Sequence, residues 1–237
     1  VGGLTVAREI MRNLPSEKIV YFGDTARVPY GNKSRETVIR YSHQICRFLQ
    51  EQQVKAIVVA CNTASAFALD AIRDDFDIPI IGVIEAGAKV AAARTRNKRV
   101  GIIGTVGTVG SGIHAEYLRK LDPEITVFGK ACPLFVPLVE EGWLHDPVTL
   151  EVASRCLQEL KDAQVDTLIL GCTHYPLIRS TIQEVMGEKV RLVNPAYETA
   201  LDLKRVLEEQ GTANDSGNLN KYEFYVSDAA EKFKQFA

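Results

Sequence analysis

No stretch of the 237-residue chain approaches the roughly 18 consecutive apolar residues that a membrane-spanning helix needs, so the sequence excludes such a helix. Charge of either sign is not in excess: 28 Lys and Arg balance 30 Asp and Glu, and the net charge is −2. This balance leaves no basic surface for a nucleic acid. The hydrophobic share of 46% is that of a globular protein with one large core or two modest ones.

Cysteine is scarce as well. Five cysteines, an odd number, are spread along a chain of medium length. A small disulfide scaffold would use a dense and even set, so the pattern predicts a protein of the reducing cytoplasm. Cys46 and Cys156 fall in amphipathic helical patterns and are expected in the core, and Cys132 is expected to have a packing role.

Short β-branched apolar runs alternate with amphipathic segments along the whole chain. Such runs, separated by helices, are typical of α/β folds in which helices cover both faces of a parallel sheet. The strands that we expect are Ile19–Phe22, Ala56–Ala60, Ile80–Ile84, Val100–Ile103, Ile125–Phe128, Thr167–Leu170, Val190–Val193 and, before a last short helix, Tyr222–Val226. The helices that we expect between them are Thr5–Asn13, Glu36–Gln52, Ala64–Asp74, Ile113–Lys120, Thr149–Ala163 and Leu177–Val185.

The chain also repeats itself. The segment 54–61 aligns without a gap onto the segment 165–172, and each is followed by a helix and another apolar strand. A second pair of segments, 14–23 and 121–129, recurs in the same order about half a chain apart. Coincidence between generic βα units is one explanation. Two similar α/β domains with mainly parallel sheets, related by a pseudo-two-fold axis and facing each other across an active-site cleft, are the other.

We expect the second explanation, with one domain formed by residues 1–86 and 195–237 and the other by residues 87–194. The repeat then predicts a further strand before Val1. The second half has the strand Val100–Thr105 ahead of its first helix, whereas the first half opens directly on the loop Val1–Thr5. Because the chain begins in a glycine loop and not with Met, we expect it to be a fragment.

Cys61 and Cys172 occupy equivalent positions in the two repeats, directly after a buried strand and directly before a helix. Ligands of parallel α/β sheets bind at the carboxyl ends of the strands. A helix N-terminus also favours a thiolate, because its free N–H groups and dipole stabilise negative charge. A lone cysteine of this kind is most often a small core residue. Two in symmetry-related turns indicate a function.

Two thiols on opposite sides of one bound molecule suit inversion at a carbon. One thiolate would remove a proton from one face and the other thiol would deliver a proton to the opposite face, so the pair must rest in opposite protonation states. No second Cys/His pair at ligand spacing accompanies Cys172 and His174, which argues against zinc. The glycine-rich segment 110–115 lies too far beyond its strand for a dinucleotide site.

Four motifs, Val1–Val6, Gly23–Gly31, Ala60–Ala64 and Gly171–Pro176, together resemble those of bacterial glutamate racemases, and the match covers essentially the whole chain. Either cysteine motif alone would indicate only the wider aspartate/glutamate racemase superfamily. The resemblance implies an isomerase that interconverts L- and D-glutamate without a cofactor or a metal. It also implies a cytoplasmic enzyme that supplies D-glutamate for peptidoglycan and that often forms dimers.

The resemblance further implies roles for individual residues. Cys61 would act on the D-enantiomer and Cys172 on the L-enantiomer, with His174 and Glu140 assisting Cys172; the neighbouring Glu141 is the alternative to Glu140. Asp24 has a capping or turn role by default and a supporting catalytic role by resemblance. The positions expected to hold the substrate are Tyr30, Gly31, Asn62, Thr63, Thr105, Thr108, Thr173 and His174.

Two other functions stay open at this point. One is racemisation of aspartate or another acidic amino acid, because a sequence does not give the depth of a cleft. The other is a glutamate-binding regulatory protein without turnover. Its motivation is that the family's Asp-Ser-Gly segment would lie before Val1, so that the chain as printed is expected to have little or no activity. The remaining histidines, His43, His114 and His145, are expected at the surface or as caps.

Overall fold

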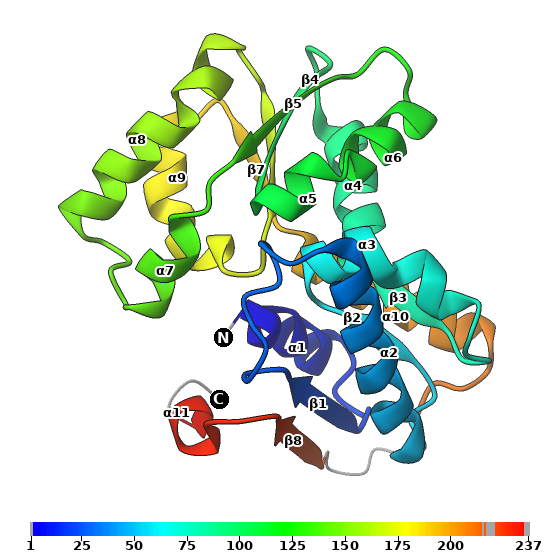
Figure 1. The fold of residues 1–237 in the computed structure, drawn as a ribbon. Coiled ribbons are helices and arrows are strands. Elements are labelled where there is room, and N and C mark those ends of the chain that lie inside the picture. The colour runs from blue at the N-terminus through cyan, green and yellow to red at the C-terminus, as the bar shows by residue number, and fades with distance from the viewer. Residues whose placement is uncertain (1, 215, 217–220, 235–237) are drawn as a thin grey trace. The chain divides into compact units, whose positions relative to one another are not determined.

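The computed structural model of the chain describes residues 2–214, 216 and 221–234. These residues divide into two compact units: the first unit holds residues 2–83 and those from 196 on, and the second unit holds residues 84–195. The sequence analysis placed the corresponding boundaries at 86/87 and 194/195. Both units are α/β with parallel strands, which confirms the predicted fold class (Figure 1).

The second unit is built on a four-stranded parallel sheet in the order β5-β4-β6-β7. Its strands are β4 (Arg99–Gly104), β5 (Thr126–Ala131), β6 (Thr167–Gly171) and β7 (Arg191–Val193). Every residue of β6 is buried, as expected for an inner strand made of a continuous apolar run. The carboxyl ends of β4 and β6 lie side by side, because Gly104 is paired with Gly171.

Helices cover both faces of this sheet. One face carries α7 (Phe135–Glu140), α8 (Pro147–Asp162) and α9 (Arg179–Met186), which pack with Leu168 and Leu170 into one core cluster. The other face carries α4 (Val83–Arg94) and α6 (Ile113–Leu121), which pack with Ile169. Successive residues of β6 therefore point to opposite cores, which is the period of a strand.

The described part of the first unit holds two pairs of parallel strands. The first pair is β1 (Ile19–Gly23) with β8 (Tyr222–Val226), and the second is β2 (Ile57–Val59) with β3 (Ile80–Gly82). Within the described residues no strand joins the two pairs, so β4 of the second unit has no counterpart there.

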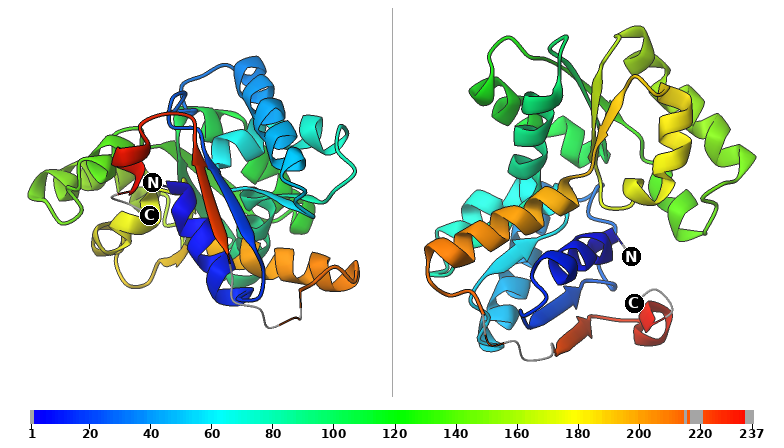
Figure 2. Two further views of the ribbon diagram at one scale, coloured as in Figure 1. Left: turned by 90° about the horizontal axis from the view of Figure 1, so that it is seen from below. Right: turned by 180° about the vertical axis from the view of Figure 1, so that it is seen from behind.

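Two clusters of helices pack on the strands of the first unit. In one, α2 (Arg35–Glu51) and α3 (Asn62–Arg73) pack with Ile57 and Ile80. In the other, α1 (Gly2–Asn13) and α10 (Pro195–Glu209) pack with residues of β1, β2 and β3; Figure 2 shows these two helices side by side. The short helix α11 (Ala230–Lys234) follows β8. No helix in the described ranges of either unit is long and apolar enough to cross a membrane.

Four helices were absent from the sequence prediction: α4, α5 (Val106–Gly110), α7 and α10. The predicted strand Ile80–Ile84 ends at Gly82, and its last two residues begin α4 instead. The sequence did not indicate this helix because it is apolar around most of its circumference, so its hydrophobic period is weak. The period of α10 is clear: its buried residues Ala196, Ala200, Leu203 and Leu207 follow the spacing of a helix face. That signal was available and was overlooked.

Cys132 is buried in the core cluster of the second unit and Cys156 packs against it, as expected, but the disulfide between them was not predicted. Cys132, which follows β5, and Cys156, on α8, form a disulfide across a sequence separation of 24 residues. An odd number of cysteines means that not all of them can be paired, but it does not exclude a single disulfide. The two cysteines can meet because β5 and α8 are in contact. Cys46, Cys61 and Cys172 are free.

His114 was expected at the surface or as a cap, and this is also wrong. Its residue exposure is 2%, and neither ring nitrogen has a hydrogen-bond partner among the described residues. Burial without a partner disfavours the charged imidazolium and lowers the pKa of His114 to about 4.

Candidate active site

The first unit places Cys61 at the turn from β2 to α3. The residue has an extended backbone and is the N-cap of α3, and its carbonyl oxygen accepts the first helical hydrogen bond, from Ser65 N–H at 2.8 Å. The carboxyl end of a parallel strand and the N-terminus of a helix therefore meet at this cysteine, as the sequence predicted. Both features favour an anion near the sulfur.

The electrostatics of Cys61 differ from the expectation of a lowered pKa. Burial raises the pKa of the Cys61 thiol, although the residue as a whole keeps some exposed surface. The backbone amides of Ala64 and Thr63 and the Thr63 hydroxyl act in the opposite sense. Because desolvation is the largest effect, the thiol form is favoured in the protein without substrate.

Two further residues beside Cys61 are almost completely buried at the start of α3. These are Asn62, with a residue exposure of 4%, and Thr63, with 2%. The amide oxygen Oδ1 of Asn62 accepts no hydrogen bond from any described residue. A buried amide acceptor without a donor costs about 1–3 kcal/mol, so its position suits a donor supplied by a bound molecule.

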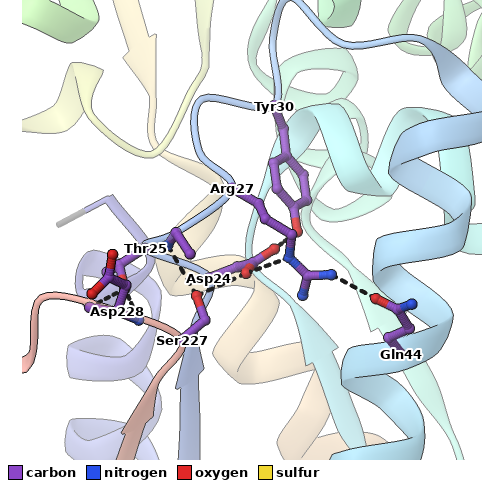
Figure 3. Close-up of polar contacts among 8 residues, drawn as sticks. Asp24, Thr25, Arg27, Tyr30, Gln44, Ser227 and Asp228 are labelled. Carbon is purple, nitrogen blue, oxygen red and sulfur yellow. Dashed lines mark hydrogen bonds and ion pairs between the residues drawn. The ribbon is translucent and has the colours of Figure 1, made fainter.

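The loop after β1 carries the other predicted residues of the first unit (Figure 3). Tyr30 donates a hydrogen bond from its hydroxyl to Oδ2 of Asp24, and both residues are buried. Arg27 Nε donates to Oδ1 of Asp24 at 2.8 Å. The turn closes at Lys33 N–H, which donates to the Tyr30 carbonyl at 3.0 Å and places Gly31 in the turn ahead of α2.

Tyr30 and Tyr21 both lie close enough to Cys61 to feel its charge. Burial, the hydrogen bond to Asp24 and the negative charges of Asp24 and Cys61 raise the pKa of the Tyr30 phenol, with burial the largest cause. Burial first and Cys61 second raise the pKa of Tyr21, on β1, to about 12. Both phenols therefore stay protonated, and the Tyr30 hydroxyl donates to Asp24.

The second unit places Cys172 directly after β6, with a residue exposure of 7%. The strand can approach β4 closely here because Gly171 has no side chain: a Cβ on Gly171 would lie 2.6 Å from the carbonyl oxygen of Ile103. The chain then turns into the short 3₁₀-helix η1 (Tyr175–Ile178), and Tyr175 N–H donates to the Cys172 carbonyl at 3.1 Å.

A line of three titratable side chains ends at Cys172. The sulfur lies 3.7 Å from Nδ1 of His174, and Nε2 of the same ring lies 3.2 Å from Oε1 of Glu140. Glu140 is the last residue of α7, and its side chain is half exposed. Of the two adjacent carboxylates, the structure brings Glu140 to His174. The arrangement can hold a proton between sulfur and imidazole while the carboxylate fixes the orientation of the ring.

The loop after the neighbouring strand β4 holds Thr105 and Thr108. Thr105 is the N-cap of α5: its hydroxyl oxygen accepts from Thr108 N–H at 3.2 Å and lies 3.0 Å from the Thr108 hydroxyl. Since Gly104 and Gly171 are paired, this loop and the Cys172 loop leave the sheet at adjacent points. Thr173 is half-buried between Cys172 and His174.

Each unit thus gathers its own predicted residues around one free cysteine. The first gathers Cys61, Asn62, Thr63, Asp24, Tyr30 and Gly31, and the second gathers Cys172, Thr173, His174, Glu140, Thr105 and Thr108. Three residues were missed by the sequence analysis: Arg27 and Ser227, which bind Asp24, and Tyr175, whose hydroxyl donates to the Cys132 carbonyl at 2.9 Å. Ser227 directly follows the last predicted strand, and this position at the end of a strand could have indicated it as a site residue.

Known proteins resemble this chain over most of its length. The family described as Asp/Glu/Hydantoin racemase matches residues 4–201. A glutamate racemase of Geobacter metallireducens is 50% identical over 98% of this chain and 86% of its own length. Among solved structures, the glutamate racemase isoform RacE1 of Bacillus anthracis covers 100% of this chain and 89% of its own, with 41% identity and a TM-score of 0.97.

A second solved structure, the glutamate racemase of Francisella tularensis in complex with D-glutamate, has a TM-score of 0.92 and 39% identity over 99% of this chain and 88% of its own. These matches extend over both units and include both cysteine turns, so the resemblance found in the sequence motifs is confirmed. The chain belongs to the Asp/Glu/Hydantoin racemase family and is an isomerase.

Proposed function

We propose that this chain interconverts L- and D-glutamate by a two-thiol mechanism, and that its D-glutamate serves peptidoglycan synthesis. The observation that carries the proposal is the equivalent placement of two free cysteines, each at the carboxyl end of a strand, with His174 and Glu140 beside the second. Glutamate as the substrate is supported by several relatives at 43–50% identity that are named glutamate racemases. An aspartate racemase of Picrophilus torridus is only 17% identical and is similar in fold alone.

In this mechanism the thiolate of one cysteine takes the α-proton from one face of the substrate and becomes a thiol. The thiol of the other cysteine gives its proton to the opposite face and becomes a thiolate, so that each turnover exchanges the protonation states of the pair. His174 would hold the Cys172 proton in transit, with Glu140 orienting its ring. Burial favours the thiol form of Cys61 in the protein without substrate.

The substrate would be held by groups that the two units present near their cysteines. The free Oδ1 of Asn62 suits a hydrogen bond from the α-ammonium group, because this acceptor is buried and has no donor. The hydroxyls and backbone amides of the turns at Thr63 and Thr173 suit a carboxylate at the start of a helix.

The resemblance also supports a cytoplasmic location and a homodimer. A pair of reactive free thiols needs a reducing compartment, and the Cys132–Cys156 disulfide is the one feature that departs from that expectation. Light scattering of the purified protein would test the dimer.

The proposal is tested by α-proton exchange in D₂O. The chain as printed and the chain preceded by the strand that the repeat predicts are each incubated with L-glutamate, and loss of the α-proton and of optical rotation is followed together. We expect exchange with loss of rotation in the chain preceded by that strand, abolished there in Cys61→Ala and in Cys172→Ala but not in Cys46→Ala, which changes a free cysteine of the core. Normal turnover in either Cys61→Ala or Cys172→Ala would exclude the two-thiol mechanism. Glutamate binding without any exchange would favour the regulatory function.

A further inference from the structure

The C-terminal strand of the first unit ends beside the candidate substrate loop. β8 is paired with β1 in parallel, and the last residues of the two strands, Val226 and Gly23, are partners. The pairing continues for one step, because Ser227 N–H donates to the Gly23 carbonyl at 3.1 Å. Ser227 is therefore fixed by the sheet next to Asp24, although 203 residues separate the two in the sequence.

Ser227 uses its hydroxyl to bind the loop at two points (Figure 3). The hydroxyl donates to Oδ1 of Asp24 at 3.0 Å and accepts from Ala26 N–H at 2.9 Å. A serine hydroxyl has one donor and two acceptor positions, so both contacts can form at the same time. The donor of Ser227 is then committed to the Asp24 carboxylate.

The Asp24 carboxylate accepts three hydrogen bonds, two from residues of its own loop and one from Ser227, which follows β8. Oδ1 accepts from Ser227 and from Arg27 Nε, and Oδ2 accepts from the Tyr30 hydroxyl. Arg27 is itself held by Gln44, at 2.6 Å, and lies with its guanidinium 4.3 Å from the ring centroid of Tyr41. No contact between Asp24 and Cys61 is observed among these interactions, whereas Tyr30 lies within electrostatic reach of Cys61.

We infer that Ser227 is a positioning residue for the substrate loop, and that it acts through Asp24 to fix the hydroxyl and the backbone turn of Tyr30. This inference rests on the proposed function, in which Tyr30 and Gly31 bind glutamate. In this arrangement the Asp24 carboxylate positions the loop. The Asp24 carboxylate connects the loop to the end of β8 through Ser227, and to α2 through Arg27, which binds Gln44.

A second contact beside Ser227 also joins the C-terminal segment to the loop. It allows the positioning role of Ser227 to be distinguished from simple anchoring of that segment. Thr25 and Asp228 exchange two hydrogen bonds: the Thr25 hydroxyl donates to the Asp228 carbonyl, and Asp228 N–H donates to the Thr25 hydroxyl oxygen at 2.9 Å. Thr25 anchors the same segment without touching the Asp24 carboxylate. Because the backbone of Ser227 is held by β1, loss of the Thr25 contacts leaves the three donors on Asp24 in place.

The test compares Ser227→Ala, the conservative variant Ser227→Thr and the anchor variant Thr25→Val. Ser227→Ala removes one donor to a carboxylate that fixes a binding group but not a reacting atom. We therefore expect KM for glutamate to rise about tenfold while kcat stays within about twofold. Ser227→Thr keeps the hydroxyl and restores KM, and Thr25→Val changes KM by less than about twofold. A purely structural role would lower the yield of folded protein and leave KM of the folded fraction unchanged.

A readout that does not depend on turnover is the ¹³Cζ resonance of Tyr30, which is assigned by its loss in Tyr30→Phe. This shift reports the hydrogen bond of the phenol, so it changes in Ser227→Ala and returns in Ser227→Thr. An unchanged shift and KM in folded Ser227→Ala, or an equal rise of KM in Thr25→Val, overturns the inference and leaves the racemase function standing. A changed shift in a protein that never exchanges the α-proton of glutamate overturns the proposed function and supports the contact.

Discussion

Nδ1 of His174 lies 3.7 Å from the sulfur of Cys172, and the opposite nitrogen of the same ring faces Glu140. The three groups come from two elements that are distant in the sequence, the end of α7 and the turn after β6. Tyr175 keeps the turn in place, because its ring packs edge-on against Phe135 at the start of α7 and its hydroxyl binds the Cys132 carbonyl. The relay is therefore built into the second unit alone.

We expect His174→Asn to lower kcat for L-glutamate by about 10²-fold, because in the proposed mechanism the variant removes the group that holds the Cys172 proton in transit. Glu140→Gln keeps the acceptor but removes its charge, and we expect a loss of about tenfold. Circular dichroism of the product measures both rates. Glu141→Gln is the matched control, since it makes the same change one residue away and should leave kcat unaltered. Equal losses in Glu140→Gln and Glu141→Gln would contradict the assignment.

The pH dependence of the reverse reaction should report the buried Cys61 thiol. Burial raises the pKa of Cys61. In the proposed mechanism the Cys61 thiolate takes the proton from D-glutamate. The rate constant kcat/KM for D-glutamate therefore increases with pH, and the increase is centred above the ordinary thiol value of about 8.5. The Thr63 hydroxyl counteracts the rise in pKa, so Thr63→Val moves the increase to still higher pH.

The control for this profile is Thr126→Val, the same change at an exposed position of β5. It should leave the profile where it is. A profile centred below the ordinary thiol pKa, or one that Thr63→Val does not move, would show that burial does not govern Cys61.

The ends of strands were the most predictable part of the site. Cys61 and Cys172 could be identified because each follows a continuous apolar run and precedes a helix, and both features are local in the sequence. His174 followed from Cys172 by proximity in the chain. Glu140 came from the family motif and had no local signal, since its partner is 34 residues away.

Contacts between distant segments could not be read from the sequence. The Asp24–Ser227 hydrogen bond depends on the parallel pairing of β1 with β8, and no short pattern specifies which strands become neighbours. The sign of the Cys61 shift was missed for a different reason. The helix N-terminus lowers a thiol pKa and burial raises it, and the sequence shows the first effect but not the size of the second.

The disulfide predicts a redox-dependent stability for the second unit. Closing a loop of this length, with a sequence separation of 24 residues, restricts the unfolded chain and stabilises the fold by about 3 kcal/mol. We expect dithiothreitol to lower the free energy of unfolding of this unit by that amount. Cys156→Ser should be less stable to the same extent and insensitive to dithiothreitol, whereas Cys46→Ala should keep the sensitivity. An unfolding curve of the wild-type protein that dithiothreitol does not move would contradict the pairing.

His114 predicts a loss of stability in mild acid. Its pKa is lowered to about 4 in the folded protein, against about 6.5 in the unfolded chain. Between these values the unfolded chain binds a proton that the folded protein does not, so the free energy of unfolding falls as the pH falls from about 6.5 to about 4, by about 3 kcal/mol. His114→Leu removes this contribution while filling a similar volume in the core.

Urea unfolding at pH 7 and at pH 4.5 measures the effect as a difference between variants, because the other titrating groups are common to all of them. We expect His114→Leu to lose less stability between the two pH values than the wild-type protein does. It should be no less stable at pH 7, since both ring nitrogens of His114 are buried without a partner among the described residues. His145→Leu changes an exposed histidine and should lose as much as the wild type. Equal losses of stability in His114→Leu and His145→Leu would mean that His114 takes up a proton in the folded protein as readily as in the unfolded chain.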